Sequence, residues 1–245
     1  MKSVVFAART QRELLRDPLS LSFALGFPLV VLLLLTAIQA NIPVSLFELD
    51  QLAPGIAVFG LSFVALFSGL LIAKDRTSSF LTRLFVSPMR PVDFILGYTL
   101  PLVPLSLAQS AVCLAAALAL GLRATARLLL VLVTLLPTAV LFIAIGLLCG
   151  SLLSDKQVGG VCGALLTNLS AWLSGIWFDL SLVGGAFETI AYLLPFAHAV
   201  DASRAALCGD YAAIMPHLWW VIGYAAALFT IAVAVFRRKM TGDKG

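Results

Sequence analysis

Residues 128–154 read LLLVLVTLLPTAVLFIAIGLLCGSLLS, a run in which no side chain carries a charge. A helix needs roughly 20 predominantly apolar residues to cross the hydrocarbon core of a bilayer, which is about 30 Å thick. This run is long enough to cross, and it is bounded by charged residues on both sides. We therefore expect a transmembrane helix at 128–153.

Five other neutral stretches share this character. They are residues 18–47, 51–73, 94–122, 157–178 and 211–236. Each exceeds the length needed to cross a bilayer. We place the corresponding spans at 19–39, 55–73, 98–122, 157–179 and 217–236. The expected fold is an all-α membrane protein in which six transmembrane helices form one domain over residues 1–245.

The composition of the whole chain agrees with a membrane protein. Hydrophobic residues make up 61% of the sequence and charged residues only 11%, whereas soluble domains have about 45–50% and about 25%. These values exclude a soluble globular enzyme, a disordered chain, a coiled coil and a disulfide-stapled secreted module. The four cysteines have no metal-binding spacing, and we assign no disulfide and no metal site.

Basic residues are unequally divided between the two sides of the membrane. With six spans, thirteen Lys and Arg residues fall at the termini, in the 74–97 loop and at 154–156, whereas three (Arg123, Arg127 and Arg204) fall on the other side. Because Lys and Arg are enriched in cytoplasmic loops, both termini and the 74–97 loop should face the cytoplasm.

No motif for catalysis or nucleotide binding occurs in the chain. There is no Gly-x-x-x-x-Gly-Lys, Gly-x-Gly-x-x-Gly, His-Glu-x-x-His or Cys-x-x-Cys pattern. The interiors of the spans also lack the ionisable side chains that ion-driven transporters usually carry. The chain is therefore not expected to be an enzyme, and it has no visible energy source of its own.

The segment before the first span has the pattern of an interfacial helix. Lys2, Arg9 and Arg16 recur every seven residues within 2–16, which places them along one helical stripe. A basic amphipathic helix usually lies on anionic headgroups. The alternative is simple positive-inside anchoring without a helix.

A second segment, residues 181–210, precedes the last span. Its neutral part, residues 189–200, is too short to cross the membrane and contains Pro195. We expect an interfacial or re-entrant segment that packs against the other helices near one surface.

The 74–97 loop is the longest hydrophilic stretch. Ser78 or Ser79 can cap a short helix, and the apolar residues that follow share one of its faces. These residues are Phe80, Leu81, Leu84 and Phe85. Such a face either docks in a groove on another protein or lies on the membrane surface, and the residue pattern leaves both open.

This loop carries a family resemblance. Asp75-Arg76 followed by Phe80-Leu81-x-Arg83-Leu84-x-Val86-Ser87-Pro88 resembles the first cytoplasmic loop of type-2 ABC exporter permeases, although Thr77-Ser78-Ser79 stands where many members have a Gly-Thr pair. Two other regions are similar to the family. The first is Arg16-Asp17-Pro18, which precedes a span that contains Pro28. The second precedes the last span and consists of Leu194-Pro195-Phe196-Ala197-His198-Ala199-Val200-Asp201 together with Arg204.

The resemblance implies the transmembrane subunit of an exporter of drugs, lipids or polysaccharides, with a hydrophobic or amphipathic substrate. The chain would pair with a second permease, either another copy or a related one, and with ATP-binding cassette subunits that hold the ATP and Mg. It would itself hold no cofactor and bind no nucleic acid. It would work by alternating access in a prokaryotic cytoplasmic (inner) membrane, among membrane lipid. Residues 1–17 would be the connecting helix, 74–97 the cytoplasmic coupling helix, and 181–210 the extracellular re-entrant segment.

The resemblance also assigns candidate site residues. Docking to the ATP-binding subunit would use polar contacts from Asp75, Arg76 and Arg83 and an apolar knob of Phe80 and Leu84. The second and fifth spans line the translocation path in this family, which implies Phe63, Phe67, Asn168 and Trp172 as substrate-path residues.

Other patterns have plainer interpretations. Gly146-x-x-x-Gly150 and Gly159-x-x-x-Gly163 have the spacing that brings helices close together in lipid, and we interpret both as packing. His198 and Asp201, three residues apart, could bind a metal or carry protons, but no third ligand accompanies them.

Three other functions remain as alternatives. An intramembrane enzyme would use Ser174 with His198, although no orienting acid stands at a known spacing. A membrane scaffold would need no ATP-binding partner. A secondary transporter is disfavoured by the uncharged span interiors.

Overall fold

The computed structural model describes residues 2–78 and 90–242, and within these ranges the chain forms helices and no strand. In chain order they are α1 (Lys2–Leu15), α2 (Pro18–Gln39), α3 (Leu49–Thr77), α5 (Pro91–Ala119), α6 (Arg127–Leu152), α7 (Asp155–Val158), the π-helix η1 (Gly159–Leu166), α8 (Thr167–Trp172), the 3₁₀ helix η2 (Leu180–Leu182), α9 (Gly185–Leu193), α10 (Pro195–Cys208) and α11 (Tyr211–Gly242). The all-α fold expected from the sequence is confirmed for the described residues.

Five of these helices are long and apolar enough to cross a membrane. They are α2, α3, α5, α6 and α11, the last counted over Tyr211–Arg238. Each overlaps one of the six predicted spans. The chain is therefore a helical protein with several membrane-length helices.

The remaining predicted span, 157–179, which is the fifth in chain order, is not one long α-helix. The short helices α7, η1 and α8 follow one another over 155–172. Three glycines at 159, 160 and 163 weaken the preference for α-helix in the middle of this segment. Gly175 then adopts a φ of +70°, which glycine tolerates without strain, so the helix cannot continue to 179.

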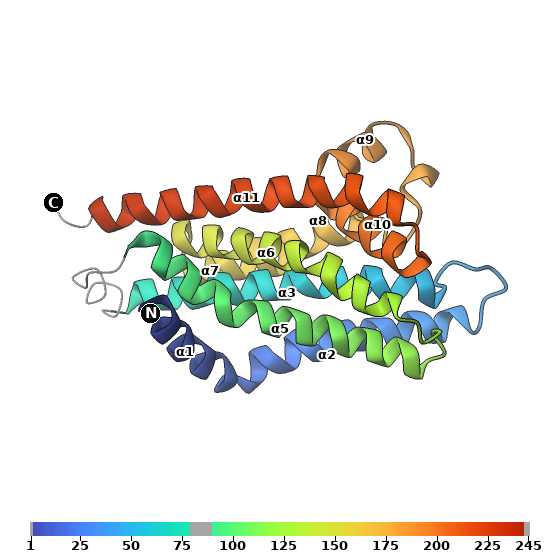
Figure 1. Ribbon diagram of the computed structural model, residues 1–245, viewed down its shortest axis with the longest axis horizontal. Coiled ribbons are helices and arrows are strands. Elements are labelled where there is room, and N and C mark those ends of the chain that lie inside the picture. The colour runs from blue at the N-terminus through green and yellow to red at the C-terminus, as the bar shows by residue number, and fades with distance from the viewer. Residues whose placement is uncertain (1, 79–89, 243–245) are drawn as a thin grey trace.

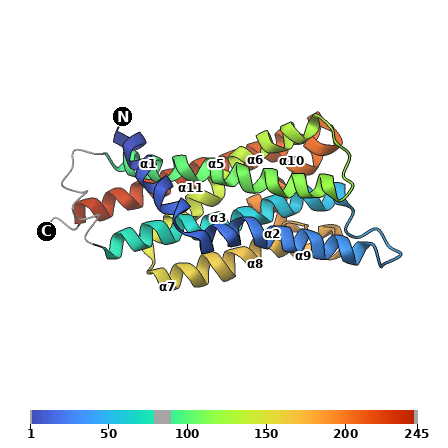
Figure 2. The same ribbon diagram turned by 90° about the horizontal axis from the view of Figure 1, so that it is seen from below.

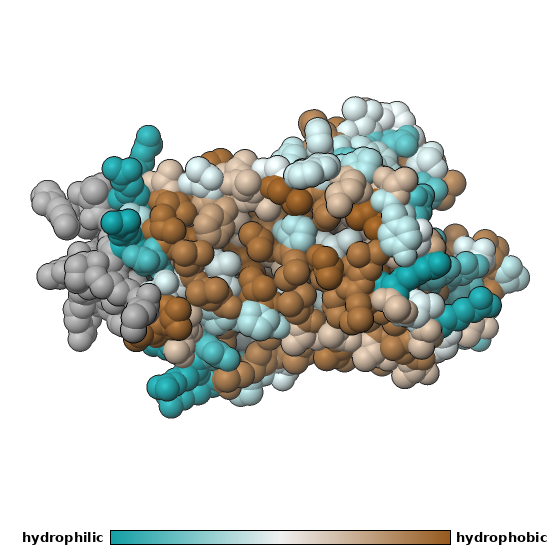
Figure 3. All heavy atoms as spheres, in the orientation of Figure 1, coloured by the Kyte–Doolittle hydropathy of each residue, from teal (hydrophilic) through white to brown (hydrophobic). Residues whose placement is uncertain are grey.

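The long helices lie side by side in a bundle, with α3 near its centre (Figures 1 and 2). In the most apolar stretch of α3, 83% of the residues are buried, against 17% in α2 and in α11. α3 therefore forms the core, and α2 and α11 present most of their apolar surface to lipid or to another chain. Figure 3 shows this surface as a hydrophobic band between two hydrophilic ends.

Glycines on α6 allow its close packing against α3. A Cβ atom at Gly146 would overlap the carbonyl oxygen of Ala65 and the hydroxyl of Ser68, and one at Gly150 would overlap the carbonyl oxygen of Gly69. By contrast, a Cβ at Gly159 would have no atom within 4 Å. Of the two small-residue motifs, the one at 146–150 holds two helix backbones together.

The helices extend beyond the neutral stretches of the sequence. α3 runs through Lys74, Asp75 and Arg76 to Thr77, and α5 begins at Pro91. The segment between these two helices is therefore 78–90, shorter than the predicted loop of 74–97. Charged residues mark the limits of the hydrocarbon core, but a helix can continue through them into the headgroup region.

The segment 181–210 contains η2, α9 and α10, which lie at one end of the bundle (Figure 1). Pro195 is the first residue of α10, a position that suits proline because the first helical N–H has no partner inside the helix. Gly209, with φ +84°, ends the helix in the left-handed conformation common after helix C-termini. The side chain of Arg127 donates to the carbonyl oxygen of Cys208 (2.8 Å) and ties this end to α6.

Candidate functional site

A pocket lined by aromatic side chains lies between α2, α3 and the η1–α8 segment. Its volume is about 470 Å³. Its lining residues, which we call the aromatic pocket, are Phe27, Phe59, Phe63, Gly163, Thr167, Asn168, Ala171, Trp172 and Trp177. Phe63 is its central ring, with its centroid 5.0 Å from that of Phe27 and 5.8 Å from that of Phe59.

Three of the four predicted substrate-path residues meet in this pocket. Phe63 comes from α3, and Asn168 and Trp172 lie one turn apart on α8. The fourth, Phe67, lines a different pocket nearer the end of α3 that carries Lys74. Phe27, Phe59 and Trp177, which no sequence pattern indicates, complete the aromatic wall.

The aromatic pocket offers few polar groups to a ligand. Asn168 donates its amide to the carbonyl oxygen of Ala164 (2.8 Å), and the Thr167 hydroxyl donates to that of Cys162 (3.0 Å). The side-chain oxygen of Asn168 makes no hydrogen bond with any described residue and can still accept one. Aromatic faces with few polar groups suit an apolar or amphipathic molecule.

At the other end of α3, Asp75 is the centre of a buried polar cluster. Its carboxylate accepts two hydrogen bonds from the Arg9 guanidinium (2.7 and 3.0 Å) and one from the Tyr98 hydroxyl (2.6 Å). Asp75 is only 3% exposed. These residues, the Asp75 cluster, join α1, α3 and α5. A two-pronged guanidinium–carboxylate pair also fixes the relative orientation of the helices.

Arg76 is likewise engaged within the chain. It donates to the carbonyl oxygens of Gly150 (2.9 Å) and Leu153 (3.1 Å), at the C-terminal end of α6. These carbonyls have no partner inside their helix, and a cation is favourable there. Asp75 and Arg76 therefore anchor the end of α3, from which the 78–90 segment departs. The other predicted docking residues, Phe80, Arg83 and Leu84, lie outside the described residues.

Arg9 and Tyr98 were not recognised from the sequence. Arg9 belongs to a predicted interfacial stripe, but it lies beside the buried face of α1, which consists of Phe6, Ala7, Thr10 and Leu14. Phe6 packs edge-on against Tyr98 with ring centroids 4.9 Å apart. A tyrosine buried in an apolar helix needs a hydrogen-bond partner. The presence of Tyr98 in an apolar stretch is therefore the sequence feature that could have indicated this polar cluster.

Two histidines meet at the opposite end of the bundle. The Nδ1 atoms of His198 and His217 are 2.8 Å apart, and Nε2 of His198 lies 2.9 Å from the carbonyl oxygen of Tyr192. Because both nitrogens of His198 are bonded elsewhere, it makes no contact with Ser174, whose hydroxyl donates to the carbonyl oxygen of Ala171 (3.3 Å). The described residues thus form no Ser–His pair. Nor does any group of three or more His, Cys, Asp or Glu residues among them suit a metal ion.

The histidine pair predicts a loss of stability in mild acid. Burial lowers the pKa of His198 below its ordinary value of about 6.5, and the charge of His217 adds to this, whereas the Tyr192 carbonyl and the Asp201 carboxylate oppose it. A lowered pKa in the folded state means that stability is present above about pH 6.5 and is lost as the pH falls below it. We expect the thermal midpoint of the purified protein to decrease as the pH is lowered from about 7.5 to about 5.5. An equally steep fall in His198→Asn would contradict this assignment.

The family model described as "ABC-2 type transporter" matches residues 3–208, from the second residue of α1 to the last residue of α10. A search of curated proteins finds no significant match to this chain. The family match covers most of the chain and agrees with its apolar helices. The chain therefore belongs to the ABC-2 type transporter family, whose membrane components are permeases that normally pair with an ATP-binding subunit and are generally not catalytic themselves.

Proposed function

We propose that this chain is the membrane-spanning subunit of an ABC exporter that moves a hydrophobic or amphipathic substrate across a prokaryotic cytoplasmic membrane. Movement would follow alternating access, driven by ATP hydrolysis in a separate subunit that holds both ATP and Mg. The chain itself would hold no cofactor. The observation that carries the substrate class is the aromatic pocket, which combines the side chains of five aromatic residues with few polar groups.

The surface around the aromatic pocket supports pairing with a second permease, most simply another copy. Trp172 lines this pocket and is still 54% exposed, and Phe27 is 40% exposed. Leu165 and Leu169, on the same helical segment, are also exposed. Two copies joined along α2 and η1–α8 would cover this apolar surface and place the two aromatic pockets next to each other.

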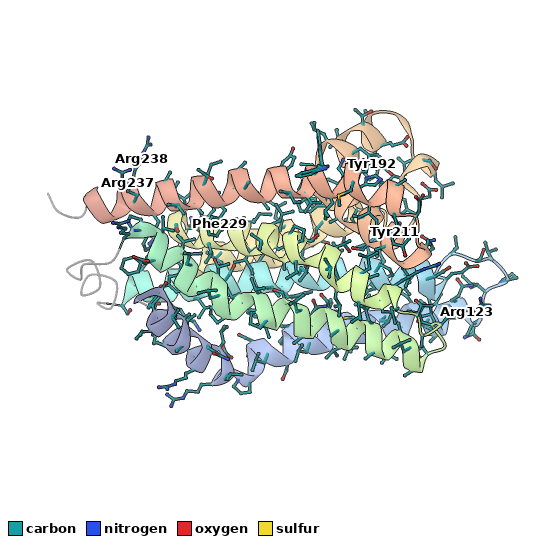
Figure 4. The ribbon with its side chains drawn as sticks, viewed as in Figure 1. Arg123, Tyr192, Tyr211, Phe229, Arg237 and Arg238 are labelled. Atoms are coloured by element: carbon teal, nitrogen blue, oxygen red, sulfur yellow. The ribbon has the colours of Figure 1, made fainter. Side chains whose placement is uncertain are left out.

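We include in the same proposal that residues 155–172 cross the membrane. Residues 155–172 would span about 27 Å if they were entirely α-helical, close to the thickness of the hydrocarbon core. With six crossings, both termini and the 78–90 segment would face the cytoplasm. Figure 4 shows Arg237 and Arg238 at one end of the bundle and Arg123 at the other. The helices of 181–210 would then lie outside, as a re-entrant segment.

Coupling to the ATP-binding subunit would use the 78–90 segment. Phe80 and Leu84 would supply the apolar knob and Arg83 a polar contact. Asp75 and Arg76, which are held by Arg9 and by the end of α6, would transmit the movement of this segment to α1, α3 and α6.

The test is reconstitution with the ATP-binding subunit. We expect this subunit to co-purify with the permease, and we expect Arg83→Glu to lower the stimulation of ATP hydrolysis by the permease, because a docking cation becomes an anion. ATPase activity in proteoliposomes is the measurement, and membrane insertion should be unchanged. Arg123→Glu, which reverses an exposed charge at the other end of the bundle, is the matched control.

Two outcomes would contradict the proposal. Normal stimulation in Arg83→Glu would remove the docking role of this residue. Purification of the chain without any ATP-binding subunit, with no change in the hydrolysis rate when one is added, would favour a membrane scaffold instead.

A further inference from the structure

A second pocket lies where α1 meets α2 beside α3, apart from the aromatic pocket. Its volume is about 460 Å³. Its floor is apolar and includes Phe67, Leu70 and Leu71 of α3, and its polar lining consists of two cations, two carboxylates and one hydroxyl, from Arg16, Lys74, Glu13, Asp17 and Ser20. We call it the interfacial pocket.

The two cations on the rim have no ion pair or hydrogen bond to any residue in 2–78 or 90–242. The carboxylates nearby do have partners, since Glu13 pairs with Arg9 (2.9 Å) and Asp17 accepts hydrogen bonds from the backbone N–H and the hydroxyl of Ser20 (3.1 and 2.7 Å). Lys74 interacts with both carboxylates through space but forms no close pair with either. The donors of the guanidinium and the ammonium group therefore remain available to an anion.

The position of the pocket in the sequence fixes its depth in the membrane. Arg16 stands directly before the apolar stretch of α2, and Lys74 directly after the apolar stretch of α3. Both lie where charged sequence gives way to hydrocarbon-compatible sequence, which is the level of lipid headgroups. Phosphate groups and the first methylenes of acyl chains meet at this level.

From this combination we infer that the interfacial pocket binds one membrane phospholipid. The phosphodiester lies between Arg16 and Lys74, and the start of an acyl chain covers Phe67, Leu70 and Leu71. Arg16 and Lys74 attract the phosphate although Glu13 and Asp17 line the same pocket, because these two carboxylates are already engaged by Arg9 and Ser20. The apolar floor selects a lipid over a free anion. The site holds a lipid whether or not the chain transports one, so it does not rest on the proposed function.

The test is native mass spectrometry of the full-length protein in detergent with added phosphatidylglycerol. We expect one tightly retained lipid per chain. Each of Arg16→Gln and Lys74→Gln should weaken its binding about fivefold, and the double variant about 25-fold, because one cation near a phosphate contributes about 1 kcal/mol. Both side chains are exposed and glutamine is a good helix former, so the variants should fold.

Arg12→Gln is the matched control, because Arg12 is an exposed cation of α1, four residues before Arg16, that does not line the pocket. Retention of the lipid in the double variant would overturn the inference, as would an equal loss in Arg12→Gln, which would indicate diffuse attraction to the basic helix. Inorganic phosphate and glycerol phosphate form separate arms of the experiment. Displacement of the lipid by either would show an anion site without lipid specificity and would also overturn the inference.

Discussion

Gly146→Ala is expected to lower the stability of the protein by about 3 kcal/mol, because overpacking a closely packed contact costs about 1–3 kcal/mol and here the obstacle is backbone. The added methyl group would overlap the carbonyl oxygen of Ala65 on α3. A flexible side chain could move away, but a helix backbone cannot do so without separating α3 from α6. The yield of monodisperse protein and its thermal midpoint in detergent are the measurements.

Gly160→Ala is the control for this effect. A Cβ at Gly160 would have no atom within 4 Å, so the same substitution meets no obstacle there. Alanine also favours helix over glycine by about 1 kcal/mol. We expect Gly160→Ala to retain normal stability. A similar loss in both variants would show that the α3–α6 contact is not as close as described.

Asp75→Ala should give the second largest loss, about 2 kcal/mol. Removing one partner of a fully buried ion pair costs about 3–5 kcal/mol, because the other charge is left without compensation. The cost is smaller here because the side chain of Arg9 is 36% exposed, although that of Asp75 is only 5% exposed. The Tyr98 hydroxyl would also lose its acceptor. Thermal unfolding in detergent measures the effect.

A double-mutant cycle separates the ion pair from other effects of the substitution. In the Arg9→Gln background, Asp75→Ala should cost about 1 kcal/mol less than in the wild-type protein. Asp50→Ala serves as the control, because Asp50 lies on the same helix and, among the described residues, its carboxylate accepts a hydrogen bond only from the neighbouring N–H of Gln51. Independent effects of Arg9→Gln and Asp75→Ala would contradict the paired arrangement.

The sequence was sufficient to predict five membrane-length helices, because a neutral run that is long enough to cross a bilayer has few other stable conformations. It was not sufficient to predict the structure of the remaining span, at 157–179. The stretch 157–179 is as apolar as the others, but hydropathy does not register a π-helix at Gly159–Leu166 or a positive φ at Gly175. Both depend on backbone conformation rather than on hydropathy.

The candidate site was likewise predicted only in part from the sequence. Phe63, Asn168 and Trp172 were chosen through the family resemblance, and the fold brings them into one pocket. Phe67 lies one helical turn from Phe63 yet lines a different pocket, because the chain that covers α3 changes from α8 to the α1–α2 junction. The pairing of Asp75 with Arg9 could not be predicted from the sequence either, because the two residues are 66 positions apart in the chain.

The meeting of three helices at one carboxylate has a mechanical consequence. Asp75 joins α1 and α5 to the end of α3, so the two helices that flank the 78–90 segment and the amino-terminal helix meet at one carboxylate. α1 connects to α2 through only Arg16 and Asp17. Under the proposed coupling, a displacement of the 78–90 segment would therefore reach the start of α2 through α1, and Phe27 of α2 forms one wall of the aromatic pocket.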